Sequence, residues 1–338
     1  MRGDVVPPKR YDVVGVGNAI VDVIAHVEDE FIVANSLPKG SMTLVDVDRA
    51  IELYASMPPA IEASGGSAAN TMAGVASFGG TAAYVGKVRQ DQLGEVFRHD
   101  IRAAGVVYEQ ALATVGPPTA RCLILVTPDA ERTMNTCLGI SSLLEPADVD
   151  EHLITAGRVV YCEGYLWDVD SAKAAIRKAM TMAKDAGSKV ALTLSDMFCV
   201  DRHRAEFRHL VEHDVDIVFA NEAEICSLYE TTDVAEALRR VRGHVEVACV
   251  TRGAEGSVVL TAAEVVQVPA WSAGSVIDTT GAGDLYAAGF LYGYTRGKDL
   301  FTAGWYGSIA AGECISHTGP RPERSLAELF AAVPSPTR

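Results

Sequence analysis

Short apolar runs rich in β-branched residues alternate along most of the chain with longer segments of helical character. This alternation is typical of parallel strands joined by helices, and it predicts an α/β fold with a mostly parallel central sheet. Glycine, proline and asparagine separate the runs, as expected for turns. The expected strands span residues 11–16, 81–88, 158–162, 190–194 and 217–220. The expected helices span residues 48–56, 65–80, 91–105, 171–186, 202–213, 285–294 and 302–316.

Two segments depart from this pattern, because residues 27–48 and 106–138 consist of short alternating runs between turn formers. Such runs indicate a small β appendage that is inserted twice into one larger domain. We therefore assign residues 11–26, 49–105 and 139–330 to a large α/β domain and residues 27–48 and 106–138 to the appendage. We expect residues 1–10 and 331–338 to be flexible termini.

Composition narrows the class of ligand. The chain has 338 residues, of which 49% are hydrophobic, so it can bury a large core. Its formal net charge of -15 argues against nucleic acid and anionic membranes as partners and favours a small molecule. Seven cysteines are scattered singly without a CxxC pair, and no apolar run is long enough to span a membrane. These features predict a soluble cytoplasmic protein with reduced thiols.

The segment DTTGAGDLYAAG, residues 278–289, combines a glycine turn, an acid and the start of an apolar helix. Gly281, Ala282 and Gly283 leave their backbone N–H groups accessible, and a helix N-terminus attracts anions. Asp284 falls in the first helical turn, where it would face the bound anion. A phosphate site with its own acid suggests phosphoryl transfer. The alternative is a tight turn that merely begins a closely packed helix.

Other polar residues stand where ligands bind in open α/β sheets, at the carboxyl ends of expected strands. Asn18 and Asp22 follow the first strand, with turn formation as the alternative for Asn18 and a solvated edge for Asp22. Gly65 and Gly66 precede a small-residue helix that carries Asn70, and backbone and amide groups there suit a polyol. The alternative is a helix packed tightly against the sheet.

Asn221 and Glu224 begin a helix directly after a strand. Their spacing is that of a capping box, but an amide and a carboxylate can also hold hydrated Mg²⁺. Thr251 and Gly253 end another strand, where they could line a nucleotide phosphate or make a hairpin. The chain has no GxxxxGK[ST] pattern, so the common phosphate-binding loop for ATP is absent.

With GGSAANTMAG, NEAE and DTTGAGD in this order, the sequence resembles the ribokinase-like, PfkB-type carbohydrate and nucleoside kinase family from about residue 11 to residue 323. Within the family it is most similar to adenosine kinases and their bacterial relatives, on GNAIVDV, ERTMNTCLG and AGWYGSIAAGECISHTG. The resemblance implies a ribokinase-like α/β/α sandwich with a small β-sheet lid, which agrees with the appendage. It also implies ATP and Mg²⁺ as cofactors, and a monomer or a homodimer joined through the lids.

The resemblance implies transfer of the ATP γ-phosphate to a primary hydroxyl. Asp284 is the implied base that accepts the substrate hydroxyl proton. The implied anion hole consists of the N–H groups of Gly281, Ala282 and Gly283. Arg132 in the lid is implied to lie over the phosphates. This chemistry leaves the protein mainly positioning and charge stabilisation, which these groups can supply.

The other implied roles fall into three groups. The residues implied to bind sugar hydroxyls are Asp22, Asn18, Gly66 and Asn70. The residues implied to bind the nucleotide and its Mg²⁺ are Asn221 and Glu224, with Glu224 acting through water, and the turn of Thr251, Gly253 and Gly256. Asp278 and Thr280 match positions that in many members bind a monovalent cation such as K⁺. Trp305 occupies a position where adenosine kinases often carry a histidine near the ATP adenine, on which a tryptophan can also stack.

The substrate is expected to be a nucleoside, most specifically adenosine, because an apolar slot for its base can be assembled beside the sugar site. The candidate slot residues are Ile20, Met134, Leu138 and Tyr165. Each of them could instead be ordinary core or lid packing. A sugar kinase acting on ribose, fructose or a related sugar is the alternative, and a non-catalytic binding paralogue is a second one.

Overall fold

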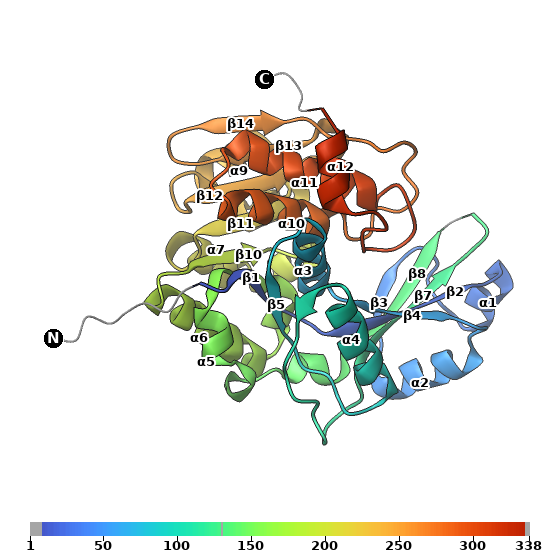
Figure 1. Cartoon of the computed structure of the whole chain (residues 1–338). Helices are drawn as coiled ribbons and strands as arrows, with labels where there is room; N and C mark the ends of the chain where they lie inside the picture. The colour runs from blue at the N-terminus through green and yellow to red at the C-terminus, as the bar shows by residue number, and fades with distance from the viewer. Residues whose placement is uncertain (1–8, 130, 335–338) are drawn as a thin grey trace.

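The computed structural model describes residues 9–129 and 131–334, and most of the expected flexible termini lies outside these residues. Within the described chain, nine strands form one large sheet in the order β14-β13-β12-β11-β10-β9-β1-β5-β6 (Figure 1). Its parallel part runs from β6 to β12, and β13 and β14 add an antiparallel edge. The strands are β1 Tyr11–Val16, β5 Ala82–Val85, β6 Val106–Val107, β9 Gly157–Glu163, β10 Lys189–Thr193, β11 Ile217–Asn221, β12 Val247–Thr251, β13 Ser257–Leu260 and β14 Val265–Val268.

Helices cover both faces of this sheet because its strands are apolar on both sides. In β1, Val13 belongs to the core on one face and Val14 to the core on the other. The first face carries α3 Ser67–Ser77, α4 Gln92–Ala103, α10 Ala282–Thr295, α11 Leu300–Cys314 and α12 Leu326–Ala332. The second face carries α5 Glu151–Thr155, α6 Asp170–Asp185, α7 Met197–His213, α8 Glu222–Tyr229 and α9 Val234–Val241. Short 3-10 turns are η1 Gly139–Leu143, η2 Pro146–Asp148, η3 Gly164–Asp168 and η4 Gly253–Glu255.

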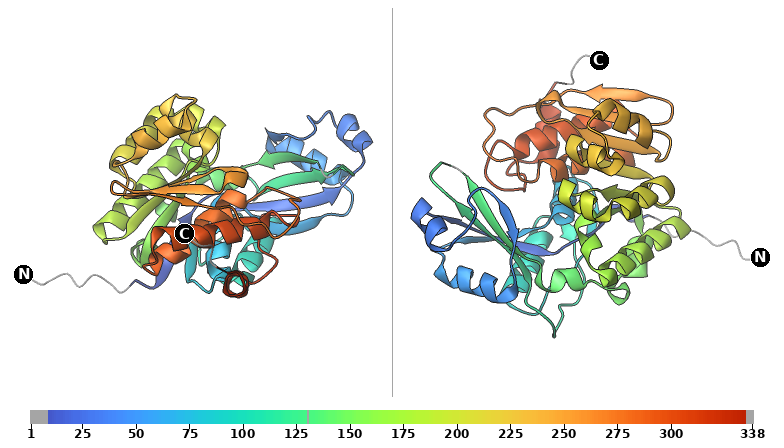
Figure 2. Two further views of the ribbon diagram at one scale, coloured as in Figure 1. Left: turned by 90° about the horizontal axis from the view of Figure 1, so that it is seen from above. Right: turned by 180° about the vertical axis from the view of Figure 1, so that it is seen from behind.

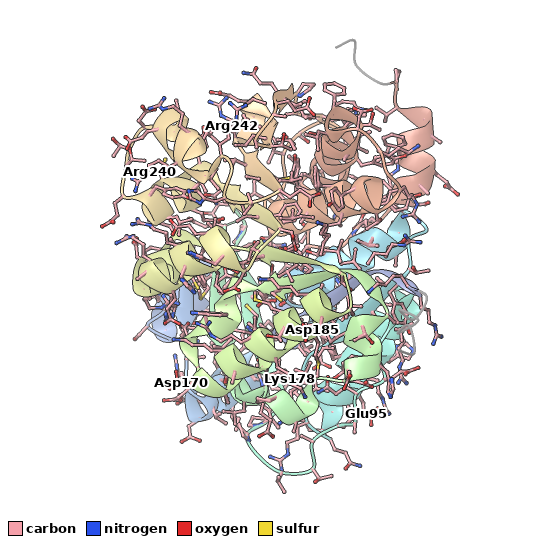
Figure 3. All side chains as sticks on the ribbon, turned by 90° about the vertical axis from the view of Figure 1, so that its left-hand side faces the viewer. Glu95, Asp170, Lys178, Asp185, Arg240 and Arg242 are labelled. Atoms are coloured by element: carbon pink, nitrogen blue, oxygen red, sulfur yellow. The ribbon has the colours of Figure 1, made fainter. Side chains whose placement is uncertain are left out.

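Helix α6 shows how the sequence produces this layer. Its buried side chains recur at helical spacing, with Ile176 and Met180 facing the sheet. Asp170 and Asp185 at its two ends point outward into solvent (Figure 3). Within the described residues, no helix is long and apolar enough to cross a membrane.

A second sheet projects from the side of the large domain (Figures 1 and 2). Its strand order is β3-β8-β7-β2-β4, with bounds Met42–Leu44, Arg132–Cys137, Ala120–Val126, Ile20–His26 and Ile61–Gly65. Helices α1 Asp29–Ala34 and α2 Val47–Ser56 lie against it, and α1 was not expected. We call this sheet the lid. Together the two sheets confirm the predicted ribokinase-like α/β fold with a β lid.

The expected boundaries between the two parts need correction at three strands. Residues 11–26 and 49–105 were assigned to the large domain, but β2 and β4 pair with each other and β7 in the lid. Residues 106–138 were assigned to the lid, but β6 pairs with β5 in the large sheet. Hydrophobic alternation identifies a strand but not the neighbour with which its backbone will pair.

Candidate active site

A cavity of about 700 Å³ lies between one face of the lid and the carboxyl ends of β9, β10 and β11. The N-termini of α3 and α10 also open into it. The expected site residues that line this cavity are Asn18, Ile20, Asp22, Gly66, Asn70, Met134, Leu138, Tyr165, Asn221, Glu224, Thr280, Gly281, Ala282, Gly283 and Asp284. Residues from opposite ends of the chain therefore meet at one place, at the carboxyl ends of the parallel strands, as the sequence predicts.

Gly281 begins α10 in a conformation that favours glycine. Its φ of 78° is left-handed, and an added Cβ would lie 2.6 Å from Cβ of Pro320. The turn directs the first N–H groups of α10 toward the cavity, where an anion is favoured. The N–H of Ala282 donates to Thr279 O at 3.2 Å, so this member of the expected anion hole already has a partner.

Asp284 in the first turn of α10 is held by helix α3. Its Oδ1 accepts a hydrogen bond from Ser67 Oγ at 2.6 Å, and its Oδ2 accepts one from Asn70 Nδ2 at 3.1 Å. Thr71 Oγ1 donates to the Asp284 carbonyl oxygen at 3.1 Å. Burial raises the pKa of Asp284 to about 6, and the hydrogen bonds from Ser67 and Asn70 and the charge of Arg321 oppose this rise. A carboxylate so poised is largely ionised at neutral pH and able to accept a proton.

Asp22 on β2 is a second buried carboxylate of the cavity. Its pKa is raised to about 7 by burial, an effect opposed by Arg321 and Arg132 and reinforced by Asp284. Gly65 on the paired strand β4 does not line the cavity but leaves room for Asp22, because an added Cβ would lie 2.3 Å from Asp22 Oδ2. The second glycine of the pair, Gly66, has a φ of 97° and is the N-cap of α3.

Glu163 at the end of β9 also lines the cavity and was not expected. Its Oε1 accepts from Asn18 Nδ2 at 3.0 Å, and its Oε2 accepts from the N–H of Ala68 at 3.0 Å. Burial raises the pKa of Glu163 to about 7. Ser141 Oγ donates to Asn18 Oδ1 at 2.9 Å, so both ends of this amide are held. Its position at the carboxyl end of a strand is the sequence feature from which a role for Glu163 in ligand binding could have been predicted.

Asn221 and Glu224 form the capping box and line the cavity, so the two interpretations coexist. Asn221 Oδ1 accepts from the Glu224 N–H at 2.9 Å, and Glu224 accepts from Asn221 N at 3.0 Å and Nδ2 at 2.7 Å. Burial raises the pKa of Glu224 to about 7. Asp196 lines the same cavity. Because the Glu224 oxygens already accept these bonds, the residues suit Mg²⁺ held through its water shell.

Arg132 is in a different place from the one expected. Its Nη1 lies 2.9 Å from Asp278 Oδ2, both side chains are at most 10% exposed, and neither residue lines the cavity. Asp278 also accepts from the N–H of Thr280 at 3.0 Å, from Thr280 Oγ1 at 2.7 Å and from the Gly319 N–H at 2.8 Å. The structure thus pairs Arg132 with Asp278 instead of directing it over the cavity. The K⁺ site at Asp278 and Thr280 stays a prediction.

The expected nucleotide residues after β12 do not line the cavity. Gly253 and Gly256 have φ values of 55° and 86° in the turn that joins β12 to its antiparallel neighbour β13, which is the hairpin alternative. Thr251 Oγ1 donates to Ala220 O at 3.5 Å. Trp305 is 5% exposed and packs in the core on the first face of the sheet, so its expected stacking on adenine stays a prediction.

Arg321 is the other functional candidate that sequence reasoning missed. Its Nε donates to Asn70 Oδ1 at 2.8 Å and its Nη2 to Ser64 Oγ at 3.1 Å. The sequence feature that could have identified it is a basic residue between Pro320 and Pro322, since both prolines restrict the backbone there. Folding brings this C-terminal side chain to residues that precede it by some 250 positions.

The chain is similar to known proteins in sequence and in fold. The family model described as pfkB family carbohydrate kinase matches residues 61–325. The chain belongs to this family. The kinase is 28% identical over 328 residues to adenosine kinase of Saccharomyces cerevisiae, covering 90% of this chain and 94% of the yeast protein. It is 27% identical over 318 residues to 5-dehydro-2-deoxygluconokinase of Bacillus subtilis, covering 91% of each.

Solved structures show higher similarity. Adenosine kinase from Sinorhizobium meliloti is 52% identical, with a TM-score of 0.87 over 95% of this kinase and 99% of that chain. A probable sugar kinase from Rhizobium etli CFN 42 is 50% identical, with a TM-score of 0.89 over 96% of this kinase and 98% of that chain. The protein is therefore an ATP-dependent carbohydrate or nucleoside kinase, and kinases of its family use ATP with Mg²⁺. Its oligomeric state and cytoplasmic location stay predictions.

Proposed function

We propose that this kinase transfers the γ-phosphate of ATP to the primary 5′-hydroxyl of adenosine. One observation carries the proposal: the cavity joins a polar end, formed around Asp284 and Asp22, to an apolar wall on the lid. Adenosine has this division, with a hydroxyl-rich ribose beside a largely planar base. The 52% identity to the adenosine kinase of Sinorhizobium meliloti supports the same substrate.

The apolar wall is formed by the cavity-facing side of the lid. Ile20, Ile124 and Met134 belong to one apolar cluster there and line the cavity. Met42 and Leu44 on β3 line it too and are 46% and 55% exposed. Exposed apolar side chains facing a cavity favour a flat apolar ligand, because they lose contact with water when it binds.

The polar end supplies the groups that a ribose and a transferred phosphate need. Asp22 and Asn70 form hydrogen bonds with the vicinal hydroxyls of the ribose. Asp284 takes the proton of the attacking 5′-hydroxyl. The N-terminus of α10 at Gly281 and Gly283 stabilises the charge of the phosphate in transfer. Mg²⁺, when bound near Glu224, neutralises further phosphate charge.

Phosphorylation of a free sugar is the second candidate. The observation in its favour is Glu163, a buried carboxylate that adds a polar group to the wall beside Asn18. The 50% identity to the probable sugar kinase of Rhizobium etli also supports it. The apolar lid wall has no counterpart in a bare sugar, and we therefore rank this candidate second.

The deciding experiment measures ADP release with ATP·Mg²⁺ and a panel of adenosine, other nucleosides, ribose and fructose. We expect adenosine to give the highest kcat/KM and adenosine 5′-phosphate as the product. Met134→Gln, which keeps the side-chain length but adds an amide to the apolar wall, should lower kcat/KM for adenosine about tenfold or more. Ribose turnover should change little in this variant. Absence of adenosine-dependent ADP release at millimolar adenosine would reject the proposal.

A further inference from the structure

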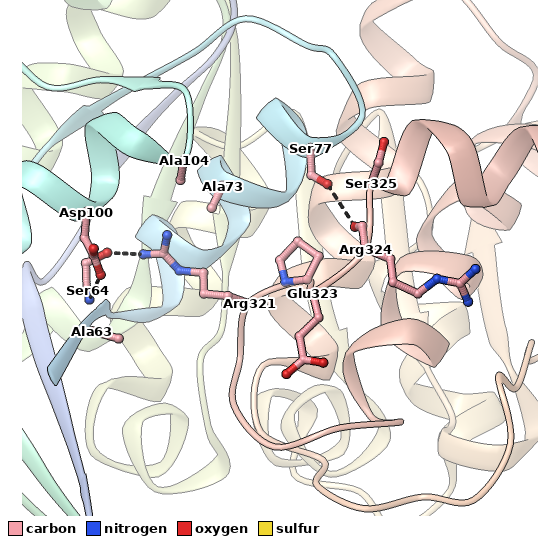
Figure 4. A pocket seen from close by; sticks show the side chains of 11 residues that line it. Ala63, Ser64, Ala73, Ser77, Asp100, Ala104, Arg321, Glu323, Arg324 and Ser325 are labelled. Atoms are coloured by element: carbon pink, nitrogen blue, oxygen red, sulfur yellow. Dashed lines mark hydrogen bonds between the residues drawn. The ribbon is translucent and has the colours of Figure 1, made fainter. Parts of the chain in front are cut away.

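The side chain of Arg321 reaches from the segment between α11 and α12 into the contact between α3 and the lid strand β4 (Figure 4). Its two hydrogen bonds end on different parts of the molecule, Asn70 on α3 and Ser64 on β4. Asp100 on α4 accepts from the Ser64 N–H at 2.9 Å, so Ser64 is itself fixed. Arg321 therefore ties the lid sheet to the helix that contacts Asp284.

The hydrogen bond from Arg321 fixes which way the Asn70 amide points. A side-chain amide has one acceptor oxygen and one donor nitrogen. Because Arg321 has only donors, it faces the Asn70 oxygen, at 2.8 Å from Nε. The Asn70 nitrogen must then point to Asp284 Oδ2, at 3.1 Å. A flipped amide would place its oxygen against the carboxylate, which is repulsive, and would lose both bonds.

Arg321 also supplies positive charge to both acids of the polar end. Its guanidinium lowers the pKa of Asp284 and that of Asp22, in opposition to burial. Arg132, on lid strand β8, is paired with Asp278. Besides burial, the charge of Asp284 raises the pKa of Asp22, Tyr161, Glu163, Tyr165, Glu224 and Cys314. None of these six carries positive charge, so the Arg321 guanidinium offsets negative charge around Asp284, and Arg132 also lowers the pKa of Asp22.

The backbone beside Arg321 is part of the same site. Pro320 lines the cavity and lies against the Gly281 turn, where an added Cβ would meet it at 2.6 Å. Pro320 and Pro322 restrict the backbone on either side of Arg321, so the position from which its side chain extends is restricted.

We propose that Arg321 is a positioning residue for phosphoryl transfer, which orients the Asn70 amide toward Asp284 and so keeps the Asp284 carboxylate aimed at the acceptor hydroxyl. This inference rests on the proposed role of Asp284 as the base. Arg321 does not line the cavity and acts on Asp284 through Asn70. Misplacing a reacting group by about 1 Å can cost on the order of 10²-fold in rate, which sets the expected scale.

The test compares Arg321→Gln and Arg321→Lys with Arg324→Gln, using the acceptor that the wild type phosphorylates. Arg324 is a matched control, because its exposed side chain carries the same charge and lines, together with Arg321, Ser64 and Ser77, a second pocket outside the cavity (Figure 4). We expect Arg321→Gln to lower kcat about 10- to 100-fold. The acidic limb of its kcat profile should move to higher pH, and KM for ATP should stay near the wild-type value. Arg321→Lys keeps the positive charge, so the acidic limb of its kcat profile should stay near the wild-type pH. Its kcat should still fall, because the hydrogen bond to Asn70 is lost.

The outcomes separate this inference from the proposed function. Wild-type kcat and an unshifted acidic limb in Arg321→Gln would overturn the positioning role even if Asp284 is the base. An equal effect in Arg324→Gln would overturn it too, because general loss of charge would then explain the change. Thermal unfolding checks that each variant folds, and should Arg321→Gln not fold, wild-type kcat in Arg321→Lys would be decisive against the inference. If the wild type phosphorylates no acceptor in the panel, the proposed function fails first.

Discussion

Ser67 Oγ donates a hydrogen bond to Asp284 Oδ1 at 2.6 Å, joining the first turn of α3 to the first turn of α10 across 217 positions of sequence. The bond ties the glycine pair before α3 to the glycine turn before α10, so the two helix N-termini open into one cavity. A hydroxyl donor to a carboxylate keeps that carboxylate in one rotamer. The orientation of Asp284 is therefore set before any substrate binds.

Replacing Asp284 by asparagine should abolish turnover while sparing substrate affinity. The amide keeps the size of the side chain but cannot accept the hydroxyl proton, so kcat should fall by at least about 10²–10³-fold. KM for the acceptor should change by less than about threefold, since the binding groups remain. Steady-state kinetics with the acceptor and ATP·Mg²⁺ measure both values. Asp185→Asn, on the solvent side of α6, is the matched control and should behave as wild type; near-normal kcat in Asp284→Asn would refute the base assignment.

The pH dependence of turnover should follow ionisation of Asp284. Burial raises the pKa of Asp284 to about 6, and only the ionised form accepts a proton. At saturating substrates, kcat should be constant above neutral pH, reach half its maximum near pH 6 and fall about tenfold per unit below that. Initial rates in buffers of constant ionic strength provide the test. A profile that stays flat down to pH 5 would contradict it.

Gly65→Ala should damage acceptor binding specifically. The new Cβ would lie 2.3 Å from Asp22 Oδ2, so the carboxylate must move away from its present position. A displaced hydrogen-bonding group in a buried site costs on the order of 1–3 kcal/mol, which predicts an acceptor KM raised by about tenfold or more. KM for ATP is the internal control and should not change. Equal increases in both constants would indicate general misfolding of the cavity instead.

Asp22→Asn should stabilise the ligand-free kinase at high pH. Burial raises the pKa of Asp22 in the folded state from 3.8 to about 7. A carboxyl whose pKa is raised by folding stabilises the folded state. This contribution is fully present below the unfolded pKa of 3.8 and is lost as the pH rises through the folded pKa of about 7. Asparagine is neutral throughout, so the variant should gain on the order of 4 kcal/mol at pH 8 and less than half of that at pH 5. Thermal unfolding of both proteins at the two pH values tests this, and a lower unfolding temperature of the variant at pH 8 would disprove it.

Local pattern was enough to predict most individual elements. The periodicity around Val13 and Val14 predicted a two-sided strand, and residues 171–186 were predicted as a helix that the structure places at Asp170–Asp185. Asp284, Asn221 and Glu224 were found because glycine turns and capping residues have recognisable local spacing. Such features depend on a few neighbouring residues, and so the sequence reveals them directly.

The local pattern could not predict to which sheet β2, β4 and β6 belong, because strand pairing joins residues far apart in sequence. The same reason applies to Trp305, which its position suggested as a ligand contact and which packing buries. Glu163 and Arg321 carried only weak local signals, and their roles depend on which groups folding places beside them.

The sequence by itself determined the α/β alternation, the presence of a β lid and the two glycine turns that start α3 and α10. Only the tertiary structure decided that Arg132 pairs with Asp278 and that Arg321 faces Asn70. The physical reason is that propensity and spacing act over a few residues, whereas the pKa of a buried carboxyl and the partner of a buried arginine depend on the whole surrounding packing.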